Sequence, residues 1–210
     1  MRLEIYADPI CPWCLIGKAL LDRALEAAPE HPFLVEWHPF QLNPEMPAEG
    51  MERHRYLEAK FGGREGAMAA YGPVLEAAEA AGLALDFGAI SRTPNTLDAH
   101  RLIHWAGLEG RQTPMVAALF RGYFQEGRDI GAPAVLADLS AEAGLDRDLV
   151  VRLLASEADR DDIRARDAGA RARGIRAVPT FILAETYVMS GAQPTALWAQ
   201  VIAETAGVTG

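Results

Sequence analysis

The sequence predicts an α/β fold that is interrupted by an all-helical insertion. Three observations lead to this prediction: a strand, helix, strand order near the N-terminus, helical patterns through the middle of the chain, and strand patterns again after Gly174. A chain of 210 residues is long enough for one large domain or one domain with an insertion. We therefore assign residues 1–45 and 174–210 to the α/β domain and residues 46–173 to the helical insertion.

The α/β domain begins with a strand. Residues 2–7 alternate apolar and polar side chains and end at Asp8-Pro9, which is a turn signal. Apolar residues then recur at helical spacing and stop near Pro29. Residues 33–40 hold the aromatic and branched side chains of a second strand. This order predicts a parallel pair of strands with a crossover helix.

The insertion is predicted to be a series of helices. Six of them are expected at residues 51–61, 65–81, 96–106, 113–125, 133–143 and 147–155. Pro73 should kink or interrupt the second helix, because proline lacks an N–H and crowds the preceding turn. A seventh helix is predicted over residues 156–173, where Ser156 and Asp159 are placed like a capping box and the charges match the helix dipole.

The chain then returns to the α/β domain. Residues 180–183 and 187–189 predict two short strands, joined by a tight connection at residues 184–186. A last helix is expected from about Pro194 to Ala206.

Composition and charge narrow the function classes. With 50% hydrophobic and 23% charged residues, the chain has the composition of an ordinary soluble globular protein. A net charge of -9 argues against nucleic acid and against an anionic membrane surface as partners. The N-terminus has no basic, apolar or cleavage region of a signal peptide, and the longest uncharged stretch, residues 186–203, is broken by polar residues. We therefore expect a cytoplasmic protein with no membrane span.

The two cysteines of the chain form the motif CPWC. Cys11 and Cys14 are too few for a secreted disulfide scaffold, so a bond between them should be chemical rather than structural. Cys11 lies where a strand meets a helix, and the free N–H groups of the helix favour an anion there. Pro12 suits the first helical turn, and Cys14 follows one turn later. Cys11 is thus the expected nucleophile and Cys14 the resolving thiol; two inert buried cysteines are the alternative.

A metal site is not predicted. His31 and His38 do not have the spacing of zinc ligands, and there is no second cysteine pair. His100 and His104 are four residues apart but lack a third ligand. Leu15 follows the second cysteine, which argues against haem attachment.

Four motifs carry a resemblance to a known family. They are CPWC at 11–14, PNTLDAHRLIHWA at 94–106, GIRAVPTFIL at 174–183 and SGAQP at 190–194. With them the chain resembles the DsbA-like thiol-disulfide oxidoreductases, and within these the FrnE-like branch. The resemblance covers nearly the whole chain. It implies a thioredoxin-like fold split by a helical insertion.

The resemblance also implies roles for site residues. In such proteins the proline at the position of Pro179 is cis and faces the redox pair, and the backbone of Val178 can pair with an extended substrate. Without the family, Pro179 would be read as the start of a strand. Pro12 and Trp13 are candidates for substrate contact, although Trp13 can instead pack on the insertion. Asn95 either contacts substrate or caps the helix that follows it.

Asp8 has two open interpretations. It lies three residues before Cys11 and can move protons to or from Cys14. The simpler interpretation is a turn residue before Pro9.

The predicted function is thiol-disulfide exchange, as reductase, isomerase or oxidant, on a protein or small-molecule thiol or disulfide. A cytoplasmic location favours reduction or isomerisation. No bound cofactor is expected; glutathione or a dithiol reductant is the expected redox partner, and a homodimer is possible because relatives often dimerise. One alternative is a glutathione-dependent isomerase or transferase related to hydroxychromene carboxylate isomerase and kappa-class glutathione transferase, although these carry serine at the first cysteine and often an acid near Gln193. A binding module or chaperone with regulatory cysteines is another.

Overall fold

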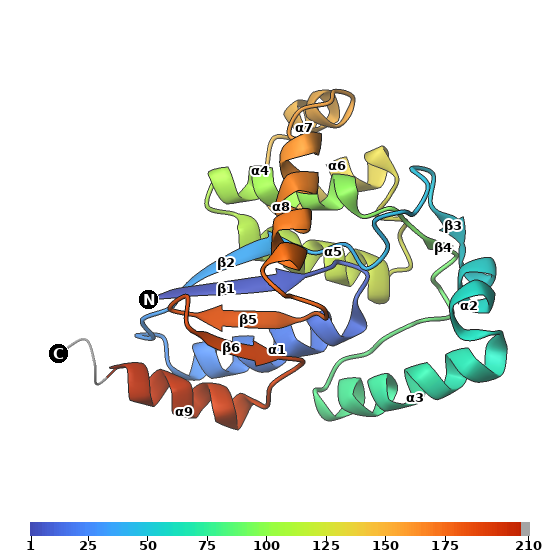
Figure 1. Cartoon of the computed structure of the whole chain (residues 1–210). Helices are drawn as coiled ribbons and strands as arrows, with labels where there is room; N and C mark the ends of the chain where they lie inside the picture. The colour runs from blue at the N-terminus through green and yellow to red at the C-terminus, as the bar shows by residue number, and fades with distance from the viewer. Residues whose placement is uncertain (207–210) are drawn as a thin grey trace.

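A computed structural model of the chain describes residues 1–206 and centres on a four-stranded sheet (Figure 1). The strand order is β2-β1-β5-β6, with bounds β1 Arg2–Ala7, β2 Leu34–Pro39, β5 Thr180–Leu183 and β6 Tyr187–Ser190. β1 pairs in parallel with β2 and antiparallel with β5, and β5 pairs antiparallel with β6. The predicted parallel pair with a crossover helix is confirmed, and that helix is α1 (Pro12–Ala27).

Helices cover both faces of this sheet. α1 and α9 (Thr195–Ala206) lie together on one face, where the fully buried Trp198 contacts Phe181 of β5 with ring centroids 4.9 Å apart. α8 (Arg160–Ala172) lies on the other face against β2 (Figure 1). The N-terminus of α1, with both cysteines, therefore emerges at one end of the sheet.

The middle of the chain is mainly helical, as predicted. Its helices are α2 Arg53–Phe61, α3 Arg64–Ala80, α4 Leu97–Leu108, α5 Gln112–Phe124, α6 Pro133–Glu142 and α7 Arg147–Leu154. Two very short strands, β3 (Met51–Glu52) and β4 (Arg92–Thr93), also pair within this segment. The division into residues 1–45, 46–173 and 174–210 stays a prediction, and residues 207–210 lie outside the described part of the chain.

The insertion shares its core with the sheet. One cluster of buried apolar side chains includes Ile5 of β1, Phe120 of α5 and Leu139 of α6. The free edge of β2 is also closed from this side: the amide of Gln112 accepts from the N–H of Trp37 (2.8 Å) and donates to its carbonyl oxygen (3.0 Å). A side chain thereby supplies the hydrogen bonds of a neighbouring strand.

The predicted capping box is wrong. α8 begins at Arg160 instead of Ser156, and Asp159 has a left-handed backbone (φ 59°) with no capping hydrogen bond from its side chain. Its carboxylate accepts from the indole N–H of Trp105 at 2.7 Å. The carboxylate of Asp159, which the local pattern assigned to the N-terminus of the helix, is therefore bound instead by Trp105, a residue distant in sequence.

The predicted interruption at Pro73 does not occur, because α3 continues through it as one helix. Proline removes the helical donor of the carbonyl four residues earlier, at Ala69. Ala69 is exposed, so water can replace that donor.

The connection between β5 and β6 is tight, as predicted. Ala184 and Glu185 both have positive φ, 50° and 59°, which is the geometry of a type I′ hairpin turn. Across residues 1–206, no helix combines the length and hydropathy of a bilayer-crossing segment.

Candidate functional site

The cysteine pair lies at the N-terminus of α1. Cys11 is the N-cap residue, with extended backbone, and Pro12 is the first helical residue. The N–H of Cys11 donates to the carbonyl oxygen of Asp8 (2.9 Å), which closes the turn from β1 into the helix. The side chains of Cys11 and Cys14 are buried and both are free thiols. The strand-to-helix placement expected from the sequence is thus observed.

A loop distant in sequence lies against Cys11. The sulfur of Cys11 is 3.6 Å from the carbonyl oxygen of Val178, and the bond between Val178 and Pro179 is cis, as the resemblance implied. Pro179 packs closely on α1, since a Cβ on Gly17 would lie only 3.1 Å from its Cγ. The fold therefore brings together Cys11, Val178 and Pro179 from opposite ends of the chain.

Cys14 is the more deeply placed thiol. Its pKa is raised well above the usual range, first by burial and then by a hydrogen bond to Cys11 and by the charge of Cys11. Burial therefore favours the protonated form of the Cys14 thiol.

Asp8 is fully buried beside this pair. Its carboxylate accepts from the N–H of Leu42 (2.6 Å) and, more weakly, from that of Ile10 (3.4 Å). Burial nevertheless raises the pKa of Asp8 to about 7, and the charge of Asp8 is among the causes that raise the pKa of Cys14. The backbone of Asp8 thus forms the turn, and the pKa of its side chain lies near neutral pH.

His100 lies next to Asp8. Its Nε2 is 3.8 Å from an oxygen of Asp8 and has no hydrogen-bond partner, and burial, with the charge of Arg166, lowers the pKa of His100 to about 3. His104 instead contacts Arg166 at 3.0 Å. The two histidines have different partners, and residues 1–206 contain no cluster of three His, Cys, Asp or Glu side chains arranged for a metal ion.

The remaining predicted residues differ in accessibility. Trp13 is 36% exposed and Pro12 is half-buried. The amide of Asn95 is engaged within the protein: its oxygen accepts from the N–H of Leu97 (2.9 Å) and its nitrogen donates to the carbonyl of Met46 (2.6 Å). These bonds are the ones expected of a residue that holds the start of α4, while substrate contact by Asn95 stays a prediction.

Two residues of the insertion near α1 were not found by sequence analysis. Tyr71 of α3 packs against a small apolar cluster that includes Ile16 of α1, and it accepts a 2.6 Å hydrogen bond from Arg53. No motif marks them, because their proximity to the cysteines depends on how α3 packs on α1. The one available signal is that α2 begins with the basic run Arg53, His54 and Arg55 in an acidic chain.

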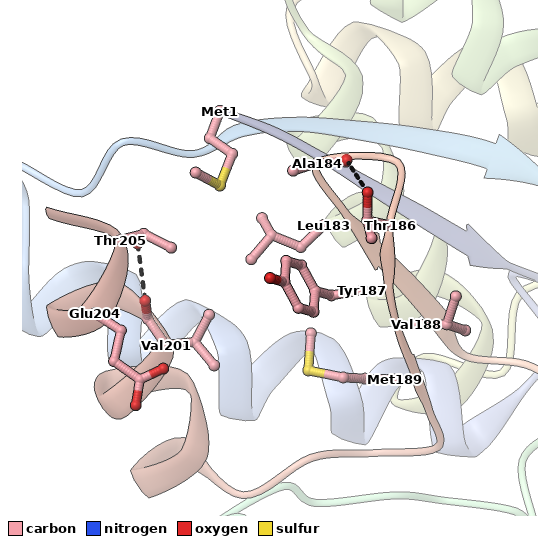
Figure 2. A pocket seen from close by; sticks show the side chains of 10 residues that line it. All are labelled: Met1, Leu183, Ala184, Thr186, Tyr187, Val188, Met189, Val201, Glu204 and Thr205. Atoms are coloured by element: carbon pink, nitrogen blue, oxygen red, sulfur yellow. Dashed lines mark hydrogen bonds between the residues drawn. The ribbon is translucent and has the colours of Figure 1, made fainter. Parts of the chain in front are cut away.

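A surface hollow of about 570 Å³ lies elsewhere on the molecule (Figure 2). Figure 2 shows Tyr187 and Met189 of β6 and Val201 of α9 around it. None of the residues that line it is among the predicted site residues. The hollow is therefore a feature of the hairpin and α9, not of the cysteine pair.

Comparison with known proteins identifies the family. The family model described as DSBA-like thioredoxin domain matches residues 2–203, nearly the whole chain. This chain belongs to that family. The predicted thioredoxin-like fold and DsbA-like membership are confirmed.

Similar proteins share this architecture. The crystal structure of a probable DsbA oxidoreductase, SCO1869 from Streptomyces coelicolor, is 35% identical, covers 99% of this chain and 90% of that chain, and has a TM-score of 0.85. The uncharacterized protein YwbO of Bacillus subtilis (strain 168) is 27% identical over 91% of each chain. The cytosolic disulfide reductase DsbM from Pseudomonas aeruginosa is 21% identical, with 99% and 100% coverage and a TM-score of 0.72; it has also been solved with GSH. A 2-hydroxychromene-2-carboxylate isomerase has a similar fold, at 16% identity, 100% and 96% coverage and a TM-score of 0.72.

Proposed function

We propose that this chain is an enzyme that exchanges thiols and disulfides through Cys11 and Cys14. The observation that carries the proposal is the pair of free thiols at the start of α1, with the sulfur of Cys11 3.6 Å from the carbonyl of Val178. Helix N-termini favour the thiolate, which is the reactive form of cysteine. Family membership supports the same chemistry.

In the first step, the thiolate of Cys11 attacks one sulfur of a substrate disulfide. The substrate S–S bond breaks, a mixed disulfide with Cys11 forms, and the other substrate sulfur leaves as a thiolate that takes a proton from water. The exposed Trp13 offers an apolar surface to the substrate. We propose that the backbone of Val178, whose carbonyl oxygen lies 3.6 Å from the sulfur of Cys11, pairs with an extended segment of the substrate.

In the second step, Cys14 attacks the sulfur of Cys11. Its proton first passes to the carboxylate of Asp8, which titrates at about pH 7 and lies in the same buried space. A Cys11–Cys14 disulfide forms and the second substrate thiol is released. The substrate thereby gains two electrons, and two thiols of glutathione or a dithiol reductant restore the pair by the reverse exchange.

The direction of exchange follows from the compartment. We propose reduction or isomerisation in the cytoplasm, because a reducing glutathione pool opposes net disulfide formation there. DsbM, a cytosolic disulfide reductase of similar fold that has been solved with GSH, is compatible with this direction and with glutathione as redox partner. Homodimerisation stays a prediction.

Reduction of insulin by dithiothreitol tests the proposed activity. The wild-type protein should accelerate precipitation of the insulin B chain, and Cys11→Ser should abolish the acceleration. Cys14→Ser should instead accumulate a mixed disulfide with insulin or with a small disulfide, visible by mass spectrometry, because the second step is blocked. Activity that survives Cys11→Ser would refute this mechanism.

A glutathione-dependent isomerase or transferase is the second candidate, supported by the fold shared with 2-hydroxychromene-2-carboxylate isomerase. Two residues count against it. Cys11 stands where such enzymes generally have serine, and the amide of Gln193, where they often have an acid, donates to the carbonyl of Ser190 (2.7 Å). Calorimetry of Cys11→Ser with glutathione decides the matter: no binding at millimolar concentration removes this candidate.

A further inference from the structure

Arg53 is a buried cation without an anion. Its residue is only 9% exposed, and its guanidinium donates to the hydroxyls of Thr93 (3.1 Å) and Tyr71 (2.6 Å). It also lies over the rings of Tyr56 and Tyr71, at 5.6 and 5.5 Å from their centroids. All of these partners are neutral. Within the described part of the chain, no carboxylate forms an ion pair with Arg53.

Arg101, another buried arginine, has both an anionic partner and several hydrogen-bond acceptors. Arg101 is fully buried and pairs with the carboxylate of Asp98 at 2.9 Å. Three more of its five N–H donors bond to the carbonyl oxygens of Leu153, Ser156 and Ala158. Buried charges in proteins are ordinarily paired, because leaving water is costly for an ion. Arg53 therefore retains the capacity to bind an anion that Arg101 has already used.

Tyr71 connects Arg53 with the cysteine site. It packs on the apolar cluster that contains Ile16 of α1, and α3 packs against α1 (Figure 1). Burial raises the pKa of Tyr71, the charge of Arg53 lowers it, and the negative charge of Cys11 raises it further.

The hydroxyl of Tyr71 also has a proton to donate. Its oxygen accepts from Arg53, and among residues 1–206 it donates to no acceptor. Tyr71 borders a hollow of about 760 Å³ between α2 and α3, together with His54, Glu58 and apolar side chains such as Met68 and Leu75. A substrate group at this border meets a hydroxyl donor backed by a guanidinium, which is the combination that a carboxylate prefers.

We propose that Arg53 and Tyr71 bind a carboxylate of the disulfide substrate while the substrate sulfur reacts with Cys11. The inference rests on the proposed exchange activity and adds a substrate class, acidic disulfides. The chain as a whole carries a net charge of -9 and repels anions at long range. A preference for acidic disulfides therefore requires a local cation, and Arg53 supplies it.

Three disulfides of similar size and different charge test this proposal. They are 3,3′-dithiodipropionate with two carboxylates, the neutral bis(2-hydroxyethyl) disulfide, and cystamine with two ammonium groups. The rate of oxidation of the reduced full-length protein is measured for each and divided by the rate of the same disulfide with 2-mercaptoethanol. We expect the normalised rate of dithiodipropionate to exceed that of the neutral disulfide about tenfold, as for a charge-assisted contact, and cystamine to react no faster than the neutral one.

Variants assign the preference to the two residues. Arg53→Gln should lower the ratio of anionic to neutral rates about tenfold, and Tyr71→Phe about threefold, since the phenyl ring keeps its packing and loses only the hydroxyl. Arg55→Gln is the matched control, because Arg55 is an exposed arginine on the same helix and should leave the ratio unchanged. Circular dichroism and melting curves verify that each variant is folded.

Each outcome bears on one proposal. A wild-type ratio near one, or equal losses for all three disulfides in Arg53→Gln, overturns the carboxylate site and leaves the exchange activity standing. Failure of the folded wild-type protein to react with any of the three disulfides refutes the exchange activity itself. A ratio that falls in Arg53→Gln and Tyr71→Phe but not in Arg55→Gln supports the proposal.

Discussion

Two buried carboxylates, one at the cysteine pair and one at the junction of α8 with the sheet, bind consecutive backbone N–H groups. Asp167 accepts from the N–H of Gln41 at 2.7 Å, and Asp8 accepts from that of Leu42 at 2.6 Å. Asp167 also pairs with Arg171 at 3.1 Å. Among residues 1–206 no cation pairs with Asp8; the neutral His100 lies 3.8 Å from its carboxylate, and the charge of Asp167 adds to the causes that raise its pKa.

The difference shows how the same burial serves two purposes. A carboxylate with a cation stays charged and holds two segments together. A carboxylate without one shares its proton near neutral pH, which suits a group that accepts a proton from a thiol. The two buried aspartates thus differ in whether a cation pairs with them: Asp167, which has Arg171, holds segments together, whereas Asp8 can accept a proton.

The largest expected effect is a gain in stability when Asp8 is replaced. Its pKa of about 7 in the folded state lies above the usual 3.8, so the folded protein favours the protonated form and loses stability as pH rises from about 4 to 7. Asp8→Asn should raise the free energy of unfolding of the reduced protein at pH 8 by about 2–4 kcal/mol and change it little at pH 4. Urea unfolding at both pH values measures this.

The same variant should slow the chemistry. Cys14→Ser stops the reaction at the mixed disulfide on Cys11. Asp8→Asn should slow only the attack of Cys14 on that mixed disulfide, since the base that accepts the proton of Cys14 is gone. An Asp8→Asn variant that is less stable than the wild type at pH 8, or no more stable than the wild type at pH 8 and at pH 4, would contradict the assignment of Asp8 as an unpaired carboxyl.

A smaller effect is expected from His100 in acid. Its folded-state pKa of about 3 lies below the usual 6.5, so the unfolded chain binds the proton and stability falls as pH drops below 6.5. Asp8 is protonated in this range and cannot compensate the charge. His100→Leu should remove about 2 kcal/mol of the loss between pH 7 and pH 5. His38, whose pKa burial lowers to about 4, should retain its own share of the loss; equal pH profiles for variant and wild type would count against the buried neutral His100.

Next in size is the loss expected from Asp167. Asp167→Asn removes the ion pair with Arg171 but keeps an oxygen that can accept from Gln41. Arg171 is partly exposed, so water moderates the change. The free energy of unfolding at pH 8 should fall by about 1–2 kcal/mol, opposite in sign to Asp8→Asn under the same conditions. Two changes of the same sign would remove the contrast between the carboxylates.

The smallest effect is expected at the surface. Asp138 and Arg147 form an ion pair at 2.8 Å with both side chains 47% exposed. Asp138→Asn should change the free energy of unfolding by less than about 0.5 kcal/mol, and the change should vanish in 1 M salt. A loss comparable to that of Asp167→Asn would show that exposure is a poor guide to the strength of ion pairs in this protein.

Local patterns predicted the elements well where each segment's own periodicity decides its structure. The strand before Cys11, the helix after it and the turn at residues 184–186 all appear where expected. The start of α8 was mispredicted because Trp105, 54 residues away, binds the carboxylate of Asp159. Local rules do not include such a competitor.

The features of the candidate site also fall into those that local spacing predicts and those that depend on tertiary packing. The order of Cys11 and Cys14 on a helix N-terminus follows from spacing, whereas the cis bond before Pro179 was expected only through the resemblance to a family. Burial of Asp8 depends on the segment that contains Leu42, and the approach of Tyr71 to α1 depends on how α3 packs. Neither leaves a mark in the neighbouring sequence.

By itself, the sequence determined the order of the longer strands and of the helices, though not the short strands β3 and β4, and it determined the thiol pair at the start of α1, since periodicity and spacing act within a few residues. Tertiary structure alone decided which buried polar groups receive a counter-charge. Desolvation and pairing depend on segments that meet only after folding, and for that reason Asp8 and Arg53 form no ion pair with an oppositely charged side chain of residues 1–206, while Asp167 and Arg101 do.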